Sequence, residues 1–210
     1  MLTDLLARMD FNVAPPVVGV SACLLGEPVR YDGADRFHPQ VAELADWVEL
    51  KRYCPEVGIG LSVPRPPIEI VRIDGSERVR GVEEPERDFT DALHDYSERV
   101  EPGIDGFIFK ARSPSCGWNT TPVFDRDGHE TGTTSGLFNQ GLRTRRPTLP
   151  FCDEEDLQNP DHRAAFVLRV WCHRQLREHP GTASMLEARA NRLEPDLARS
   201  LRKQLALGAG

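Results

Sequence analysis

Short apolar runs, each enclosed by Pro or Gly, are the feature that most constrains the fold of this chain. Val17–Val20 lies between two prolines and a Ser/Ala/Cys/Gly turn, and Phe107–Phe109 is equally short. A run of this length fits a buried strand of the parallel type better than a helix. Residues 68–73 alternate as a strand does, and residues 79–82 are expected to pair with them across an Asp-Gly turn.

Helix-like segments separate these runs. Pro39 is expected to begin one helix, with its apolar residues 41, 44, 45 and 48 on one face, and Thr90 suits the N-cap of another that runs from 91 to 100. We predict no regular element in 117–136, and a short helix with a break at Gly141 before a last strand near 148–151. This alternation predicts an α/β fold, an open, mainly parallel sheet flanked by helices.

The composition becomes acidic and helical from about residue 153. An Asn-Pro-Asp sequence at 159–161 predicts the start of a helix that ends near His179, and further helical sequence follows Thr182 with an interruption at Pro195. The sequence therefore divides into an N-terminal extension (1–15), an α/β domain (16–155) and a C-terminal helical extension (156–210).

Composition limits the classes of function. The chain of 210 residues is 39% hydrophobic and 28% charged, as in folded water-soluble domains. We expect no membrane span because no apolar run reaches about 18 residues. The N-terminal sequence has no secretion signal, so we expect a cytoplasmic protein. The net charge of −7 gives no overall attraction to nucleic acid.

Three of the five cysteines share one local context. Cys23, Cys54 and Cys116 each follow an apolar run at the start of a loop rich in Gly or Pro. Because the carboxyl ends of parallel strands line one crevice, these residues could meet in space. Three thiolates with an open fourth position indicate an iron–sulfur cluster or a catalytic zinc ion, whereas three unrelated core cysteines are an equally weighted interpretation of the spacing alone.

The other two cysteines have different contexts. Cys172 lies within a predicted helix beside a tryptophan and is expected in the core, whereas Cys152 follows a candidate strand and is the one extra cysteine that we consider for the site. The odd total argues against a disulfide framework.

The sequences around the three cysteines form an ordered set. They are SACLLG (21–26) with RYDG (30–33), CPEVGIGLSVPRPPIEI (54–70), DFT (88–90) and FKARSPSCG (109–117). The set resembles the DUF523 family, whose characterised relatives are thiouracil desulfidases, over residues 16–155. The chain departs from the family pattern at Gly-Ile-Gly-Leu (58–61), where Gly-Gly-Leu is usual, and at 124–128.

The resemblance implies a [4Fe–4S] cluster as cofactor, with Cys23, Cys54 and Cys116 as its protein ligands. It also implies that the iron without a protein ligand takes up the sulfur of the substrate, and that the products are the oxo base and sulfide. A soft thiocarbonyl sulfur suits such a site.

Water must attack the ring carbon, so a general base is required. Glu56, two residues after a proposed ligand, is our first choice, although it could instead cap backbone amides of its loop. Ser113 and Ser115 are expected to donate hydrogen bonds to cluster sulfurs or to substrate, and the alternative is a simple Ser/Pro turn.

Three further residues are candidates for substrate binding. Lys110 ends a predicted strand and could also neutralise the thiolates. Arg65, between two prolines, could contact an anionic part of the substrate. Asp32 precedes a glycine and is most simply a turn residue. For Lys110 and Arg65, a solvent-exposed side chain is the alternative interpretation.

The sequence thus favours a cluster-dependent desulfidase that acts on a thiolated pyrimidine, as a free base or a nucleotide, with tRNA less favoured by the acidic charge. One alternative is a non-enzymatic redox sensor whose helical extension docks a partner through an exposed apolar stripe (Phe166, Val170, Leu176, Leu186 and Leu193). Another is a zinc hydrolase that uses the same cysteines.

Overall fold

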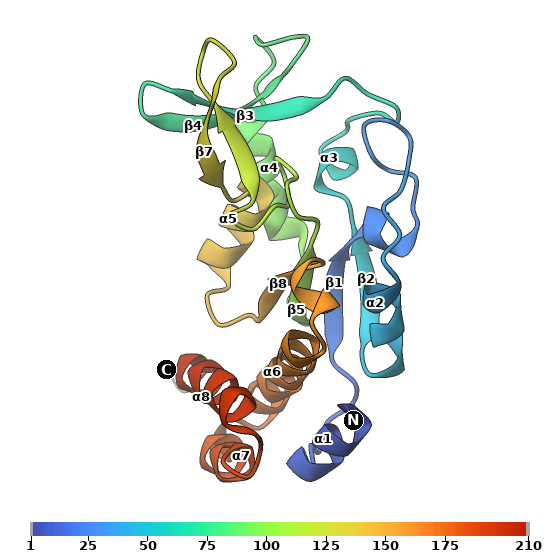
Figure 1. The fold of residues 1–210 in the computed structure, drawn as a ribbon, viewed down its shortest axis with the longest axis vertical. Helices are drawn as coiled ribbons and strands as arrows, with labels where there is room; N and C mark the ends of the chain where they lie inside the picture. Colours follow the sequence, from blue (N-terminus) through green and yellow to red (C-terminus); the bar gives the residue numbers. More distant parts are fainter. Residues whose placement is uncertain (1, 209–210) are drawn as a thin grey trace.

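A four-stranded parallel sheet forms the centre of the molecule (Figure 1). The computed structural model describes residues 2–208. The strand order is β2-β1-β5-β8, and the strands are β1 (Val17–Ser21), β2 (Glu49–Tyr53), β5 (Ile104–Phe109) and β8 (Phe151–Asp153). All neighbours pair in parallel, so the predicted α/β class with a mainly parallel sheet is confirmed.

The sheet is buried on both faces, and all six residues of β5 are accordingly buried. Ile108 packs into one core with residues of β1 and the terminal helices. Phe107 and Phe109 point into a second core, where both rings contact the ring of Phe138. Helices therefore cover both faces, as expected for a doubly wound sheet.

A second sheet projects from the first with the strand order β4-β3-β6-β7 (Figure 1). Its hairpin of β3 (Ile68–Ile73) and β4 (Ser76–Gly81) matches the predicted pair, although β4 begins earlier than expected. The prediction of no element in 117–136 is wrong, because β6 (Thr121–Phe124) and β7 (Glu130–Thr134) lie there. Since β6 is short and pairs with β3, tertiary contact rather than local pattern creates it.

The short helices differ from their predicted forms. The helix that begins at Pro39 is only one turn, α2 (Pro39–Ala42), and continues as the 3-10 segment η2 (Glu43–Asp46). This change of helix type turns Ala45 outward, so its predicted place on the apolar face is wrong. One-turn elements also follow β1 and β2, namely η1 (Ala22–Leu25) and α3 (Pro55–Gly58).

Two helices pack tightly at a glycine on one side of the sheet. They are α4 (Thr90–Tyr96), which is extended by η3 (Ser97–Arg99), and α5 (Leu137–Arg145). The predicted break at Gly141 is wrong, since α5 continues through this residue. Glycine is needed there because a Cβ would lie 2.6 Å from the His94 carbonyl oxygen of α4. The predicted N-cap role of Thr90 is also wrong. Thr90 is the first helical residue, and its hydroxyl accepts from the Val79 amide.

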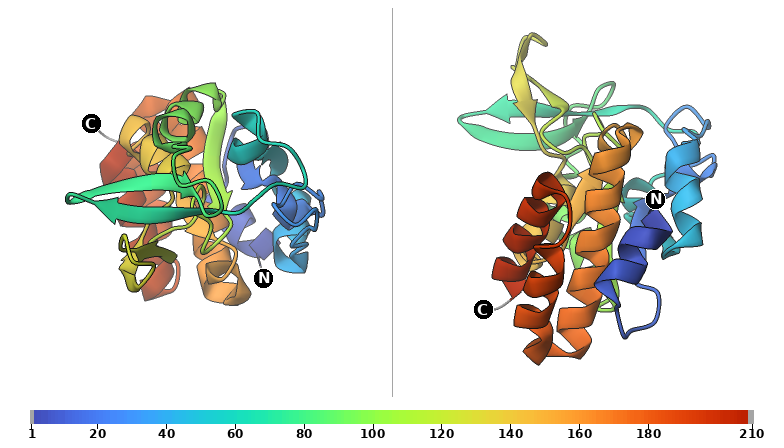
Figure 2. Two further views of the ribbon diagram at one scale, coloured as in Figure 1. Left: turned by 90° about the horizontal axis from the view of Figure 1, so that it is seen from above. Right: turned by 60° about the horizontal axis from the view of Figure 1, so that its bottom comes forward.

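The terminal helices pack together against the other face of the sheet (Figure 2). They are α1 (Leu2–Met9), α6 (Pro160–Glu178), α7 (Ala183–Ala190) and α8 (Pro195–Gly208), with η4 (Asp156–Gln158) and η5 (Pro180–Thr182) as connections. The Asn159 side chain caps α6 as predicted. Among the described residues, no helix combines the length and apolarity that a membrane span requires.

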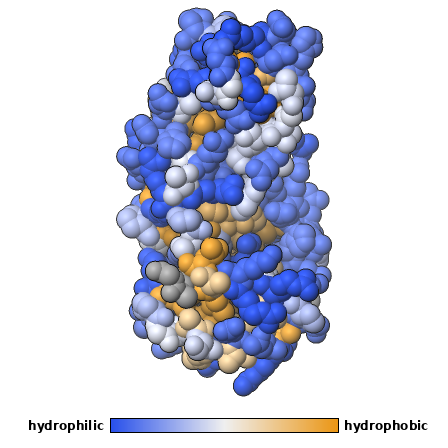
Figure 3. Space-filling model, turned by 90° about the vertical axis from the view of Figure 1, so that its left-hand side faces the viewer, coloured by the Kyte–Doolittle hydropathy of each residue, from blue (hydrophilic) through white to orange (hydrophobic). Residues whose placement is uncertain are grey.

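The apolar stripe of the helical extension is covered rather than exposed. Phe166, Val170, Leu176, Leu186 and Leu193 are all buried, and all belong to the core shared with α1 and β1. On the face shown in Figure 3, apolar side chains gather in the lower half of the molecule. The stripe that would favour a partner-docking sensor is therefore used for internal packing.

A buried carboxylate joins the helical extension to the sheet. Asp105, near the start of β5, is completely buried and accepts a hydrogen bond from the Val17 amide of β1. From α6, His173 lies 3.3 Å from this carboxylate, Arg174 lies 3.3 Å away and Arg177 lies 2.9 Å away. Two guanidinium groups thus compensate for the burial of one negative charge.

Replacement of Asp105 by Ala should therefore destabilise the whole protein. Removing one partner of a buried charge network leaves the others uncompensated, at a cost of about 3–5 kcal/mol. Urea unfolding should show a lower midpoint. The matched control is Asp196→Ala, which removes an exposed ion pair with Arg199 and should leave the midpoint unchanged. Equal midpoints for both variants would contradict the proposed anchoring.

Candidate functional site

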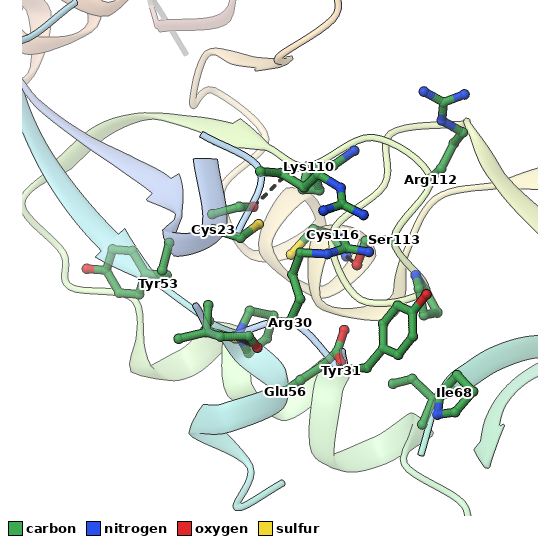
Figure 4. A pocket seen from close by; sticks show the side chains of 18 of the residues that line it. Cys23, Arg30, Tyr31, Tyr53, Glu56, Ile68, Lys110, Arg112, Ser113 and Cys116 are labelled. Atoms are coloured by element: carbon green, nitrogen blue, oxygen red, sulfur yellow. Dashed lines mark hydrogen bonds between the residues drawn. The ribbon is translucent and has the colours of Figure 1, made fainter. Parts of the chain in front are cut away.

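A cavity of about 430 Å³ lies at the carboxyl ends of β1, β2 and β5 (Figure 4). The strands end together, because Ser21 pairs with Tyr53 and Val20 pairs with Ile108. Five cations and one carboxylate line the cavity beside its cysteines: Arg30, Arg36, Arg65, Lys110, Arg112 and Glu56. This position is where ligands bind in open α/β sheets.

The structure brings Cys23, Cys54 and Cys116 to this one cavity. Cys23 lies in η1 directly after β1, and Cys54 lies between β2 and α3. Cys116 comes from the longer loop after β5. Figure 4 shows the sulfur atoms of Cys23 and Cys116 turned toward the same space. Their meeting follows from parallel strand pairing, although 62 residues separate the last two in sequence.

Burial favours the neutral form of all three thiols, although cations line the same cavity. Burial is the main cause that raises the pKa of Cys23, to about 11, and the neighbouring Cys54 adds to the effect. Burial likewise raises the pKa of Cys54, and it raises the pKa of Cys116 well above the ordinary value. A bound metal reverses this preference, because its positive charge stabilises thiolate ligands.

At least two of the three sulfur atoms lie farther apart than two thiolates on one zinc ion do. Three thiolates on one zinc ion lie about 3.8 Å apart, given tetrahedral Zn–S bonds of about 2.3 Å. Among the described residues, the one group of three such ligand atoms within 4.8 Å of one another is Asp125, Asp127 and His129, at the exposed turn between β6 and β7. At least one distance within the cysteine trio therefore exceeds 4.8 Å.

The first turn of α5 holds the loop that carries Cys116. The amides of Leu137 and Asn139 donate to the carbonyls of Pro114 and Ser115 at 3.1 and 3.2 Å. The buried Asn139 side chain also donates to the Cys116 carbonyl. These bonds satisfy helix N-terminal amides that otherwise lack partners. Asn139 was not among the predicted site residues, and no local sequence signal distinguishes it.

Glu56 lies in the first turn of α3 and forms the centre of a buried polar network. Its Oε2 accepts from the Arg65 Nε at 3.0 Å and Nη2 at 2.7 Å. Its Oε1 accepts from the Ser115 hydroxyl at 2.9 Å. Three residues predicted from the sequence therefore form one connected group, in which Arg65 engages a carboxylate of the protein itself.

Ser113 and Lys110 also have partners within the protein. The Ser113 hydroxyl accepts from the amides of Ser115 and Cys116 at 3.3 and 3.2 Å, so it stabilises the turn. The Lys110 ammonium donates to Glu154 Oε1 at 2.6 Å, and the other oxygen of Glu154 accepts from the Ala111 amide at 2.7 Å. Glu154 was missed from the sequence, since nothing local relates it to Lys110.

Asp32 lies outside the cavity lining, on the loop between η1 and α2. Its Oδ1 accepts from the Ala34 amide at 3.1 Å, as expected for a turn residue. Its carboxylate also pairs with Arg30 at 3.4 Å and Arg36 at 3.7 Å, and both arginines line the cavity. The sequence analysis quoted Arg30 and Tyr31 within the RYDG motif without recognising that they reach the cavity.

The remaining two cysteines do not line this cavity. Cys152 is buried in β8, where it pairs with Ile108. Cys172 is completely buried in α6, as predicted, and burial raises its pKa to about 12. Cys23, Cys54 and Cys116 are therefore the cysteines with access to the cavity within the described part of the chain.

Comparisons with known proteins add independent information. Residues 18–155 match a protein family described as 2-thiouracil desulfurase. An uncharacterised protein of Bacillus subtilis (strain 168), YbbK, is 31% identical over 107 residues, which cover 47% of this chain and 71% of YbbK. A solved structure, the [4Fe–4S]-dependent thiouracil desulfidase TudS, is similar with a TM-score of 0.56 and 29% identity, over 74% of this chain and 99% of TudS.

Replacement of Gly136 by Ala should displace the loop that carries Ser115 and Cys116. A Cβ at this position would lie 2.3 Å from the carbonyl carbon of Ser115 and 2.6 Å from the Cys116 nitrogen. Such overpacking costs about 1–3 kcal/mol. Thermal unfolding should show the loss, and alkylation of Cys116 should become faster. The control Gly103→Ala meets open space and should change neither quantity. An unchanged alkylation rate in the Gly136 variant would refute this account of the loop.

Proposed function

Because this chain belongs to the 2-thiouracil desulfurase family, we propose that it is an enzyme that removes sulfur from a thiolated pyrimidine and uses a [4Fe–4S] cluster as cofactor. The family match confirms the resemblance that the cysteine-bearing motifs indicated. The observation that carries the proposal is the convergence of Cys23, Cys54 and Cys116 on one cavity from three separate loops. TudS, a protein of similar structure, is a [4Fe–4S]-dependent thiouracil desulfidase.

The donor set fits the cluster. Two buried thiols and one partly buried thiol line the space, and at least one pair of their sulfur atoms lies farther apart than two thiolates on a single zinc ion. When bound, the cluster would supply an iron with an open coordination position, which is a soft acceptor for thiocarbonyl sulfur. The buried apolar stripe argues against the partner-docking sensor.

The protein groups around the cavity suit a hydrolytic exchange, in which water replaces sulfur at a ring carbon and sulfide leaves. Glu56 is our general base and accepts the proton of the attacking water on Oε1, the oxygen that faces Ser115. The Ser115 hydroxyl orients that oxygen. Ser113 stabilises the loop that presents Ser115 and Cys116.

The positive lining suits an electron-rich or anionic substrate. Lys110 pairs with Glu154, whereas Arg30 and Arg36 share the single carboxylate of Asp32, so these cations outnumber their carboxylate partners. A free thiolated base is electron-rich and its nucleotide is anionic, so both suit this lining. The cavity volume of about 430 Å³ suits such small molecules, and the net charge of −7 disfavours tRNA.

Cluster content should depend on the three cavity cysteines. Protein reconstituted without oxygen should contain about four iron and four sulfide per chain. Cys23→Ala, Cys54→Ala and Cys116→Ala should each lose most of the iron. Cys152→Ala is the matched control, because that thiol is also buried but lies outside the cavity, and it should retain the iron. Zinc in place of iron and labile sulfide in the wild type would overturn the cofactor proposal.

Loaded wild-type protein should release sulfide from 2- or 4-thiouracil or the corresponding nucleotides. Glu56→Gln should retain its iron and lower kcat by about a hundredfold or more, because the amide cannot accept the proton. Glu178→Gln is the control, since Glu178 also pairs with an arginine but lies on α6. Sulfide release by Glu56→Gln at the wild-type rate would exclude Glu56 as the base.

A further inference from the structure

Arg65 is an arginine enclosed within the protein. Its side chain is 4% exposed, and Pro64 and Pro66 restrict the backbone on either side. Its backbone amide donates to the Tyr31 carbonyl at 2.9 Å. A guanidinium buried to this degree must satisfy its donors locally, and the structure gives their partners.

All three guanidinium nitrogens donate to the protein. Nε and Nη2 both donate to Oε2 of Glu56, at 3.0 and 2.7 Å. Nη1 donates to the Ser62 carbonyl at 3.0 Å, and Nη2 also donates to the Val29 carbonyl at 3.0 Å. Arg65 is therefore committed to internal partners rather than aimed at a ligand.

The geometry at Glu56 is asymmetric. A guanidinium often pairs with both carboxylate oxygens, but here both of its donors converge on Oε2. Oε1 is left with the Ser115 hydroxyl at 2.9 Å. Arg65 thus distinguishes the two oxygens of one carboxylate and fixes the rotation of Glu56.

The same guanidinium links the loops that carry the cavity cysteines. The Val29 carbonyl lies on the loop after Cys23 and also accepts a hydrogen bond from the Cys54 thiol, at a sulfur–oxygen distance of 3.9 Å. Glu56 belongs to α3, which follows Cys54, and through Ser115 it reaches the loop of Cys116. One side chain therefore connects all three segments.

We propose that Arg65 is a positioning residue that fixes Oε1 of Glu56 as the proton-accepting atom and holds the three cysteine loops in register. This inference rests on the proposed desulfidase function. It replaces the interpretation of Arg65 as a group that binds an anionic part of the substrate. Arg65 acts through Glu56 and does not touch the substrate.

The first test separates kcat from KM in Arg65→Lys and Arg65→Gln, with activity expressed per bound cluster. Lysine keeps the charge but cannot reproduce the planar set of donors. In both variants kcat should fall by about ten- to a hundredfold and KM should stay within about twofold. The control Arg126→Gln removes an exposed arginine pair with Asp74 and should change neither constant. A raised KM with unchanged kcat would show a substrate contact and overturn the proposal.

A double-mutant cycle tests whether Arg65 acts through Glu56. In the Glu56→Gln background, Arg65→Lys should lower sulfide release by less than about twofold, because the positioned carboxylate is already absent. A full ten- to hundredfold further loss would mean that Arg65 acts independently of Glu56, and the positioning role would be wrong.

A test without turnover keeps this inference separate from the proposed function. In iron-free Arg65→Gln, alkylation of Cys54 should be about tenfold faster than in the wild type, because the loop around Val29 is released. Cys172 should stay unmodified, which excludes global unfolding, and Arg126→Gln should behave as the wild type. Unchanged Cys54 reactivity would refute the linking role, whereas a wild type that contains its cluster but releases no sulfide would refute the desulfidase function alone.

Discussion

The parallel pairing of β1 with β2 and β5 is the constraint on which the rest of the structure depends. Because Ser21 pairs with Tyr53 and Val20 pairs with Ile108, the three strands end at one level. Every loop that leaves those ends enters the same cavity. If the three strands did not run in the same direction, one cysteine would lie at the far edge of the sheet.

The cavity lies at the boundary between the two cores that cover the sheet. Cys23 belongs to the core of the terminal helices, whereas Cys116 belongs to the aromatic core around Phe138. Burial from both sides makes the thiolate form costly until a cation compensates it. The apolar packing that stabilises the fold therefore also makes the thiols dependent on a metal-containing partner, and it couples cofactor binding to local order.

Sequence patterns predicted the elements whose signal is local. Val17–Val20 and the cap at Asn159 were recognisable, because burial on both faces and helix capping leave local traces. The strand β6 was not recognisable from the sequence, since its four residues become a strand only beside β3. Gly141 was misinterpreted for a related reason: the sequence shows a helix-weakening residue, but not the neighbouring helix whose backbone requires it.

The sequence by itself determined the chemistry available to this protein: three cysteines at strand ends, a glutamate two residues after one of them and a serine beside another. Residue type and position at the end of a short apolar run are local properties, so they can be recognised without coordinates. Only the tertiary structure decided which polar side chains form hydrogen bonds with each other. Arg65 donates to Glu56, and Glu154 accepts from Lys110, because hydrogen bonds depend on distances of about 3 Å that chain folding alone creates.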